Sequence, residues 1–445
     1  MQPTQNAALE HVKIVDLTRI LAGPWATQTL ADLGADVIKI ESPSGGDDTR
    51  HWGPPFTGPD QTDASYDAAY FYTANRNKKS VAIDFSTDQG AELVRQLVAQ
   101  SDVFIENFKV GGLQRYGLDY PTLKKLKPDL IYCSITGFGQ TGPYAQRAGY
   151  DFIIQAMSGL MSVTGQAPGT PGDEPMKIGV ALSDVLTGLY SCIGILTALA
   201  HRDRTGEGQH IDMSLLDVSV AAMANQSLNY LVSGNAPVRM GNAHPNIVPY
   251  QVFPTTDGHL IITAGNERQF RSLCKVLGDE SLADDERFRS NQLRVANRDE
   301  LVAAIKTRSA MQTSDQLINA LSNAGVPCGP INNMDAVFAD PQVIARQMQI
   351  ELPKDESASS ATEIADSASA SSMEKALPPR TAPGVACPVR LSATPPSYRS
   401  APPVLGNHTL EVLQQRLGLS DQQTTDLIKA GVCHTSKNTD QGSAR

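Results

Sequence analysis

The stretch VKIVDLTRILAGPWATQTLADLGADVIKIE, residues 12–41, decides the fold class. It opens with a short β-branched run, continues through a segment of helical character, and closes with a second apolar run, ADVIKIE. This order predicts a strand, a helix and a strand. Two strands joined by such a helix pair in parallel with a right-handed crossover. The stretch therefore predicts the opening of a doubly wound α/β sheet.

Glu41, at the end of the second predicted strand, raises the question of a dinucleotide site. In dinucleotide-binding units an acid at this place binds a ribose hydroxyl. Such units also need a GxGxxG turn after the first strand, whereas this chain has TRILAGPW with Pro24 inside the expected turn. The missing glycines disfavour a nicotinamide cofactor.

The alternation of strands and helices continues to about residue 136. SVAIDF, DVFIENF and LIYCSIT predict three further strands, separated by the helical segments DQGAELVRQLVAQ and YPTLKKLKP. Ligands of open parallel sheets bind beyond the carboxyl ends of the strands. We therefore expect a binding site where the loops bearing Leu21 and Ala22, Asn107 and Phe108, and residues 136–139 meet.

The later sequence predicts a second, smaller domain and an insertion. Residues 1–218 are expected to form a large domain, and 245–343, with alternating apolar runs and an Asp257-Gly258 turn, a smaller α+β domain. Residues 355–376, rich in Ser and Ala, are expected to be a disordered insertion. Residues 385–432 are expected to return to the large domain.

One acidic residue, Asp184, stands at the start of the apolar stretch LSDVLTGLYSCIGILTALA. The simpler interpretation is a helix-start acid, with Ser183 capping the helix and Asp184 favoured by the macrodipole. The alternative is a nucleophilic carboxylate kept ionised by the helix N-terminus, with Gly179 and Gly188 nearby. The stretch by itself does not decide between the two.

Composition limits the other possibilities. The 445 residues carry a net charge of −10, which argues against nucleic acid as a partner. Six cysteines without a CxxC and eight histidines without HxH or HExxH offer no metal site. The apolar Asp184 segment carries Ser, Thr and Gly and is interpreted as a core helix, so no membrane is expected. The N-terminal residues lack a signal pattern, and we expect a cytoplasmic protein.

Several segments taken together resemble the type III CoA-transferase family of formyl-CoA and carnitine-CoA transferases. They are the opening stretch, NRNKKS, ENFKVGGLQRYGL, SITGFGQTGPYAQRAGYD, SDVLTGLY, RTGEGQHIDMSLLD and PPVLGNHT. IVPYQVF, AGNERQF and GVPCGPINNMDAVFADPQV further resemble the branch that transfers CoA between succinyl-CoA and glutarate.

The resemblance implies an interlocked-ring homodimer of two-domain subunits, with acyl-CoA and a carboxylic acid as substrates and no tightly bound cofactor. Asp184 matches the family's nucleophile, which forms anhydride and aspartyl-CoA intermediates. The positions that match CoA contacts are Leu21, Ala22, Ile83, Asp84, Phe85, Ser86, Asn107, Phe108, Lys109, Arg115, Thr136, Gly137, Phe138 and Gly139. Two positions differ from the pattern, since Ser42 and Thr136 stand where some relatives have Arg and Lys.

Two other functions fit the same resemblance. An α-methylacyl-CoA racemase shares the fold but needs a histidine where this chain has Tyr150, and a non-catalytic acyl-CoA-binding protein would not need Asp184. Glu267 is either a second active-site acid or a solvated loop carboxylate. His244 is either catalytic or a local hydrogen-bonding residue.

Two further expectations concern the chemistry of the site. A dicarboxylic substrate calls for an arginine that binds its second carboxylate, and the candidates are Arg147 and Arg239. The oxyanions formed during acyl transfer call for backbone donors, which residues 136–142 and Gly241 are placed to supply.

Overall fold

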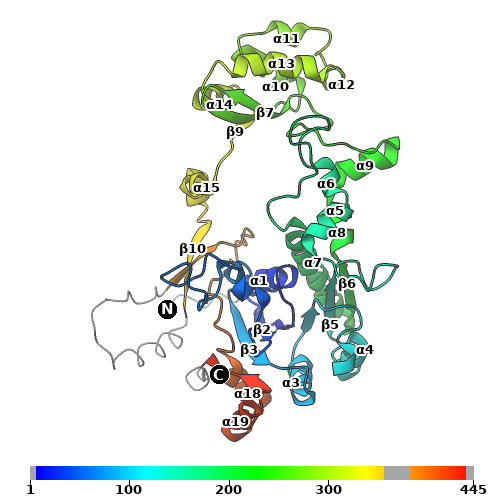
Figure 1. The fold of residues 1–445 in the computed structure, drawn as a ribbon, viewed down its shortest axis with the longest axis vertical. Coiled ribbons are helices and arrows are strands. Elements are labelled where there is room, and N and C mark those ends of the chain that lie inside the picture. Colours follow the sequence, from blue (N-terminus) through cyan, green and yellow to red (C-terminus); the bar gives the residue numbers. More distant parts are fainter. Residues whose placement is uncertain (1–6, 355–380, 437–445) are drawn as a thin grey trace, which may run out of the picture. The chain divides into compact units, whose positions relative to one another are not determined.

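The computed structural model describes residues 7–354 and 381–436, which form two compact units (Figure 1). The first unit comprises Met1–Ser158, Gly179–Ala224 and Ile344–Arg445, and the second comprises Gly159–Ile178 and Asn225–Val343. The expected boundaries, 1–218 and 245–343, assigned residues 159–178 to the large domain, whereas these residues belong to the second unit. The Ser/Ala-rich insertion expected at 355–376 lies outside the described residues.

The first unit is built on a sheet of seven strands. They are β1 (Lys13–Asp16), β2 (Asp36–Glu41), β3 (Lys78–Ile83), β4 (Val103–Glu106), β5 (Ile131–Thr136), β6 (His210–Ser214) and β12 (Cys433–His434). Their order is β12-β3-β2-β1-β4-β5-β6, and all neighbours are parallel except β12, which is antiparallel to β3. The central order 3-2-1-4-5-6 is that of Rossmann folds, with its switch point between β1 and β4. The predicted α/β class and parallel sheet are thus observed.

Helices cover both faces of this sheet. They are α1 (Ala22–Asp32), α3 (Asp88–Ala99), α4 (Tyr120–Leu126), α5 (Asp151–Met157), α7 (Leu182–Thr205), α8 (Leu215–Ala222), α18 (Thr409–Leu417) and α19 (Asp421–Lys429). Shorter elements are η1 (Asp48–His51), α2 (Ala69–Tyr72), η2 (Gln114–Tyr116) and the antiparallel pair β10 (Gln349–Pro353) and β11 (Thr381–Val385). α16 (Pro341–Ala345) contains the boundary between the two units.

Alternation along the strands divides the core into two layers. In β1, Ile14 packs with α1 and α7 on one face of the sheet, whereas Val15 packs with α3 and α18 on the other. Phe104 in β4 joins the Val15 layer and Ile105 joins the Ile14 layer. Full burial of each such side chain contributes about 1.5–3 kcal/mol. Because both faces are covered, these strands read as nearly continuous apolar runs.

The second unit has a three-stranded antiparallel sheet, β7-β8-β9, with helices beside it. Its elements are α6 (Leu160–Val163), α9 (Ala224–Ser233), β7 (Tyr250–Thr255), β8 (Gly258–Thr263), α10 (Glu267–Val276), α11 (Ser281–Asp284), α12 (Asn291–Ala296), α13 (Arg298–Ser309), α14 (Ser314–Asn323), β9 (Cys328–Pro330) and α15 (Met334–Ala339). The predicted hairpin is confirmed, with its turn one residue earlier than expected: Thr256 and Asp257 form the turn, and Gly258, at a φ of 152°, begins β8 opposite Thr255.

The segment GYDFIIQAMSGLMSVTG, residues 149–165, has a helical pattern but forms two helices. α5 ends at Met157 and α6 begins at Leu160, because Gly159 has a φ of 90°. The Asp184 helix, α7, extends to Thr205 and ends at Gly206 in the left-handed conformation. By length and composition alone, α7 is the one described helix that could span a membrane, a property that core helices share.

Candidate active site

A cavity of about 700 Å³ lies within the first unit, at the carboxyl edge of the parallel sheet. Its walls are the loops after β1, β2, β3, β4 and β5, together with Leu215 at the start of α8 and Asp184 in α7. The carboxyl ends of all six parallel strands therefore contribute to one hollow, as ligand sites of such sheets do.

Most of the residues singled out in the sequence line this cavity. They are Asp184, Leu21, Ala22, Ile83, Asp84, Phe85, Ser86, Asn107, Phe108, Lys109, Arg115, Thr136 and Gly137. Phe138 and Gly139 do not line it. Phe138 is buried in the core against α1 and α7, and the Gly139 N–H donates to Thr136 Oγ1 over 3.0 Å. These two residues can act on a ligand only by shaping the loop, and the binding roles of the others stay predictions.

Asp184 lies in the first turn of α7 and is half-buried at the cavity wall. Burial, followed by the negative charge of Asp151, raises the pKa of Asp184 to about 7. One of the two interpretations of the sequence had the helix N-terminus keep this carboxylate ionised, whereas burial and the neighbouring acid raise its pKa. Near neutral pH the group is therefore divided between acid and carboxylate.

The N-terminus of α7 is capped by Asp151, from the start of α5, and not by Ser183. Asp151 Oδ1 accepts from the backbone N–H of Ser183 over 2.8 Å and lies 3.4 Å from that of Asp184. The Ser183 hydroxyl instead accepts from Ser219 Oγ in α8, 2.9 Å away. Since Asp151 comes from a different helix, the predicted local cap is wrong, and a tertiary contact replaces it.

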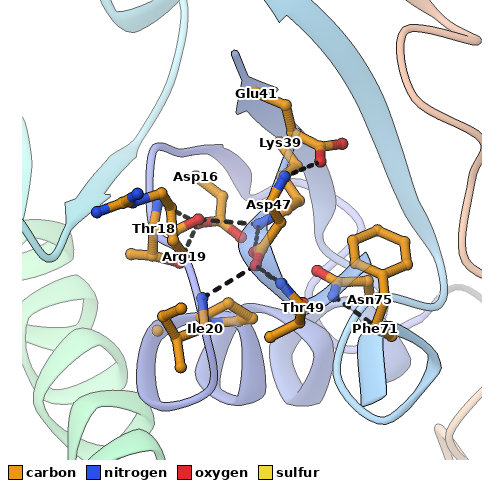
Figure 2. A network of polar contacts seen from close by, with 12 residues as sticks. Asp16, Thr18, Arg19, Ile20, Lys39, Glu41, Asp47, Thr49, Phe71 and Asn75 are labelled. Atoms are coloured by element: carbon orange, nitrogen blue, oxygen red, sulfur yellow. Dashed lines mark hydrogen bonds and ion pairs between the residues drawn. The ribbon is translucent and has the colours of Figure 1, made fainter. Parts of the chain in front are cut away.

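A buried polar network fixes the β1–α1 loop, residues 17–21, beside the cavity (Figure 2). Lys39 and Asp47 form an ion pair of 2.9 Å, and neither side chain is exposed to solvent. Burial would raise the pKa of Asp47, but Lys39 and the N–H and hydroxyl of Thr49 hold it at about 2. Burial lowers the pKa of Lys39, but the negative charges of Asp47, Asp16 and Glu41 outweigh burial and raise this pKa above its usual value. Both groups are therefore charged at neutral pH.

Glu41 is not available for a ribose hydroxyl. Its carboxylate accepts from Arg50 Nε and Nη2 over 2.9 and 2.7 Å, and from Ser80 Oγ over 2.6 Å. Burial raises the pKa of Glu41, but the charge and hydrogen bonds of Arg50, the charge of Lys39 and the Ser80 hydroxyl together outweigh burial and lower this pKa below its usual value. The acid that suggested a dinucleotide site thus has a structural role.

Four cationic side chains border the cavity beside Lys39: Arg19, Lys109, Arg115 and Arg147. Arg19 pairs with Asp48 over 3.0 Å, and both side chains are about half exposed, so the pair is weak. Arg147 stacks on the rings of Phe138 and Tyr144, at 5.3 and 4.6 Å, and no acid among the described residues pairs with it. These cations give the cavity a capacity to bind anions.

Arg239, His244 and Glu267 lie in the second unit. Arg239 Nη2 donates to the backbone oxygen of Asp173 over 2.6 Å, which commits it to its own unit. His244 Nδ1 accepts from the Asn246 N–H over 3.0 Å, a local hydrogen bond. Glu267 is exposed and accepts from the Asn291 N–H over 3.2 Å. For His244 and Glu267 these contacts favour the simpler interpretations.

The glycine loop supplies fewer free backbone donors than expected. The Gly139 N–H is bound to Thr136, and the N–H of Gln140 donates to Asp212 over 3.0 Å. The Gly241 N–H donates to the oxygen of Gly165 over 3.0 Å. As oxyanion donors these three amides are already engaged within the protein.

The sequence did not reveal the parts played by Lys39, Asp47 and Asp151. Lys39 offered a signal, because a lysine inside the apolar strand DVIKIE must be buried and therefore needs an acidic partner. Asp47 lies in the Gly/Ser-rich segment SGGDD, where nothing distinguishes it from a solvated loop acid. Asp151 reaches its partner from another helix, which only the tertiary structure places.

Comparison with known proteins gives the family. The model of CoA-transferase family III matches residues 9–409. A succinate–glutarate CoA-transferase of Agrobacterium fabrum is 49% identical over 93% of this chain and 96% of its own length. The human succinyl-CoA:glutarate CoA-transferase is 42% identical over 95% of this chain and 89% of its own. A crystal structure of a CaiB/BaiF family protein from Brucella suis is 50% identical with a TM-score of 0.77, covering 93% of this chain and all of that one. This chain therefore belongs to CoA-transferase family III and is a CoA-transferase.

Proposed function

We propose that the protein moves CoA from succinyl-CoA to a dicarboxylic acid such as glutarate, with Asp184 as nucleophile. The observation that carries the proposal is the half-buried Asp184 carboxylate on the wall of a cavity that holds most of the positions expected to bind CoA. The names of the two curated relatives support the choice of substrates.

The reaction proceeds by exchange of acyl partners on Asp184. The carboxylate attacks the thioester carbonyl of succinyl-CoA, the C–S bond breaks, and a mixed anhydride and CoA thiolate form. The thiolate attacks the aspartyl carbonyl, releasing succinate and leaving aspartyl-CoA. Glutarate then attacks this thioester to give a second anhydride, and the freed thiolate attacks its glutaryl carbonyl, giving glutaryl-CoA and restoring Asp184. One thioester replaces another, so the overall exchange needs no external energy source.

The test of this function is a panel of CoA esters against mono- and dicarboxylic acids, with products read by mass spectrometry. We expect glutaryl-CoA from succinyl-CoA and glutarate, and no exchange of the α-hydrogen of a branched acyl-CoA with solvent deuterium. Deuterium incorporation without CoA transfer would support the racemase instead, although Tyr150 occupies the position where that enzyme needs histidine.

The pH dependence of transfer should follow the ionisation of Asp184. Its pKa is raised to about 7, so the nucleophilic carboxylate is lost as pH falls through 7, and kcat/KM should rise between pH 6 and 8. Asp151→Asn removes one charge that raises this pKa while its amide oxygen can still accept from the Ser183 N–H. We expect the rising limb to move to lower pH in that variant. A limb that stays in place would show that Asp151 does not set the ionisation of the nucleophile.

Arg147 is the candidate that we propose to bind the second carboxylate of the acceptor. It lines the cavity, whereas Arg239 is bound to backbone oxygens in the second unit. Arg147→Gln should raise KM for glutarate about tenfold, the effect of losing one charge-assisted hydrogen bond, and leave KM for pentanoate unchanged.

The matched control for Arg147 is Arg115→Gln, which removes another cavity cation expected near the CoA phosphates. This variant should raise KM for the CoA ester and change KM for glutarate and for pentanoate by the same factor. If Arg147→Gln raises KM for glutarate and for pentanoate by the same factor, Arg147 binds CoA and not the acceptor.

The quaternary structure is proposed to be the interlocked homodimer of the family. Exposed apolar side chains gather on α5 and α7 of the isolated chain: Phe152, Ile153, Met157, Leu189, Tyr190, Ile193 and Leu196. An apolar surface of this kind on a soluble enzyme indicates an interface. A second copy of the chain is the partner that the family resemblance provides.

A further inference from the structure

The β1–α1 loop forms one wall of the cavity and has an unusual backbone. All five of its residues line the cavity. Within it, Ile20 has a φ of 72°, in the left-handed region, which a β-branched side chain rarely adopts. Such a conformation persists only where the surrounding structure fixes it, and it is a frequent feature of ligand sites.

Side chains from three other places bind the backbone of Thr18 and Arg19 in this loop. Asp16 Oδ1 accepts from the Thr18 N–H over 2.9 Å, and Lys39 Nζ donates to the Thr18 oxygen over 2.8 Å. Asn107 brackets Arg19, accepting from its N–H over 3.0 Å and donating to its oxygen over 2.7 Å. The ends of the loop make regular backbone hydrogen bonds, since the Leu17 N–H donates to the Ile105 oxygen of β4 over 2.9 Å and the Leu21 oxygen accepts from the Trp25 N–H of α1 over 2.7 Å. Between them, the backbone of Thr18 and Arg19 is bound by side chains.

Asp47 binds the strained residue itself. Its Oδ1 accepts from the Ile20 N–H over 3.2 Å and from the Thr49 N–H over 3.0 Å, while Oδ2 pairs with Lys39 (Figure 2). Its own N–H donates to Glu41 Oε2 over 3.0 Å, which fixes the carboxylate in turn. Asp47 is the shared point of the bonds to Ile20 and, through Lys39, to Thr18.

We infer that Asp47 is a positioning residue for the CoA thioester, holding Ile20 in the left-handed conformation so that Leu21 and Ala22 meet the ligand at the start of α1. This inference rests on the proposed function, since Leu21 and Ala22 are expected CoA contacts. Asp47 borders the cavity, yet its side chain is 0% exposed. Its effect on a ligand is therefore transmitted by the loop.

The direct test is calorimetric binding of free CoA to the full-length protein. Asp47→Ala should raise the Kd for CoA and the KM for the acyl-CoA about tenfold, with kcat and the KM for the acceptor acid changed less than about threefold. Measurements are made well below the melting temperature of each variant, so that loss of folded protein does not enter. An unchanged Kd for CoA in Asp47→Ala overturns the inference.

The matched control is Asp67→Ala. Asp67 pairs with Arg50 over 2.8 Å, and Arg50 binds Glu41, so Asp67 belongs to the same polar network without touching the β1–α1 loop. It should leave the Kd for CoA within about twofold of wild type even where it lowers the melting temperature. An equal loss of CoA affinity in both variants would show that Asp47 contributes only to the stability of the network, and would overturn its positioning role.

A second experiment tests the strained residue. Glycine adopts a φ of 72° without steric cost, so in an Ile20→Gly background the restraint from Asp47 is less needed. Asp47→Asn, which keeps a carbonyl oxygen and is the variant to use if Asp47→Ala fails to fold, should weaken CoA binding less in Ile20→Gly than in wild type. Equal losses in the two backgrounds would contradict the inference.

The two proposals fail differently. If wild-type protein does not bind CoA, the proposed function fails and the role of Asp47 fails with it. If wild type binds CoA and transfers it, but Asp47→Ala binds CoA as tightly, only the positioning role fails.

Discussion

Asp184→Asn is expected to abolish CoA transfer, with kcat falling on the order of 10⁴ to 10⁶-fold, as when a sole nucleophile is removed. An amide of nearly the same shape preserves the packing at the start of α7 and the contact of its N–H with Asp151. The variant cannot form the anhydride, because a carboxamide has no carboxylate oxygen that could attack the thioester carbonyl. Binding of CoA in the calorimeter should stay within a few-fold of wild type.

Stability provides the control for this variant. The pKa of Asp184 is raised from 3.8 to about 7 in the fold, so the folded chain holds a proton that the unfolded chain releases. The ionised group therefore lowers the stability of the wild type as pH rises from about 4 to about 7. At pH 8 the melting temperature of Asp184→Asn should be no lower than that of wild type. At pH 5 the melting temperature of wild type should rise relative to that of the variant. A variant that is inactive because it is misfolded would melt lower at both.

The covalent intermediate gives the sharpest evidence. Wild type incubated with acyl-CoA alone should accumulate an aspartyl thioester that hydroxylamine cleaves, marking residue 184 in a peptide map. A mark on Asp151 or Glu267, or a tenth of the wild-type rate remaining in Asp184→Ala, would assign the nucleophile elsewhere.

Ile193→Asp should convert the protein to an inactive monomer or leave it unfolded. Ile193 lies in α7 and is 58% exposed in the isolated chain, among other apolar side chains of that helix. A charge placed in the proposed interface would be desolvated without a partner, which costs several kcal/mol. Sedimentation velocity at about 1 μM and the dependence of Tm on protein concentration measure the effect.

Leu126→Asp is the matched control for the interface. Leu126 is 50% exposed at the end of α4, in the same unit, and belongs to no such cluster on α5 or α7. It should remain dimeric and active. A dimeric and stable Ile193→Asp protein, or a fully active wild-type monomer at nanomolar concentration, would contradict the proposed interface.

Much of the fold could be predicted from short segments of the sequence. β1, α1 and β2 could be predicted because a β-branched run, a segment of helical character and a second apolar run are signals within 30 residues of one another. The break at Gly159 does not follow from the helical pattern of residues 149–165, because a glycine inside such a pattern is usually tolerated, whereas here it takes a positive φ. The edge strand β12 also escaped prediction, since a two-residue strand forms only where β3 offers it a partner.

The sequence by itself determined the α/β class, the parallel order of the first strands, and Asp184 as the acid to examine. Each depends on neighbours in the chain or on a resemblance spread along it. Tertiary structure alone decided that Asp151 caps α7, that Glu41 is bound by Arg50, and that Asp47, paired with Lys39, binds the backbone of the left-handed residue Ile20. These contacts join residues that separate loops and helices bring together. A carboxylate in a loop looks the same in sequence whether it meets water or a buried lysine, and only packing distinguishes the two.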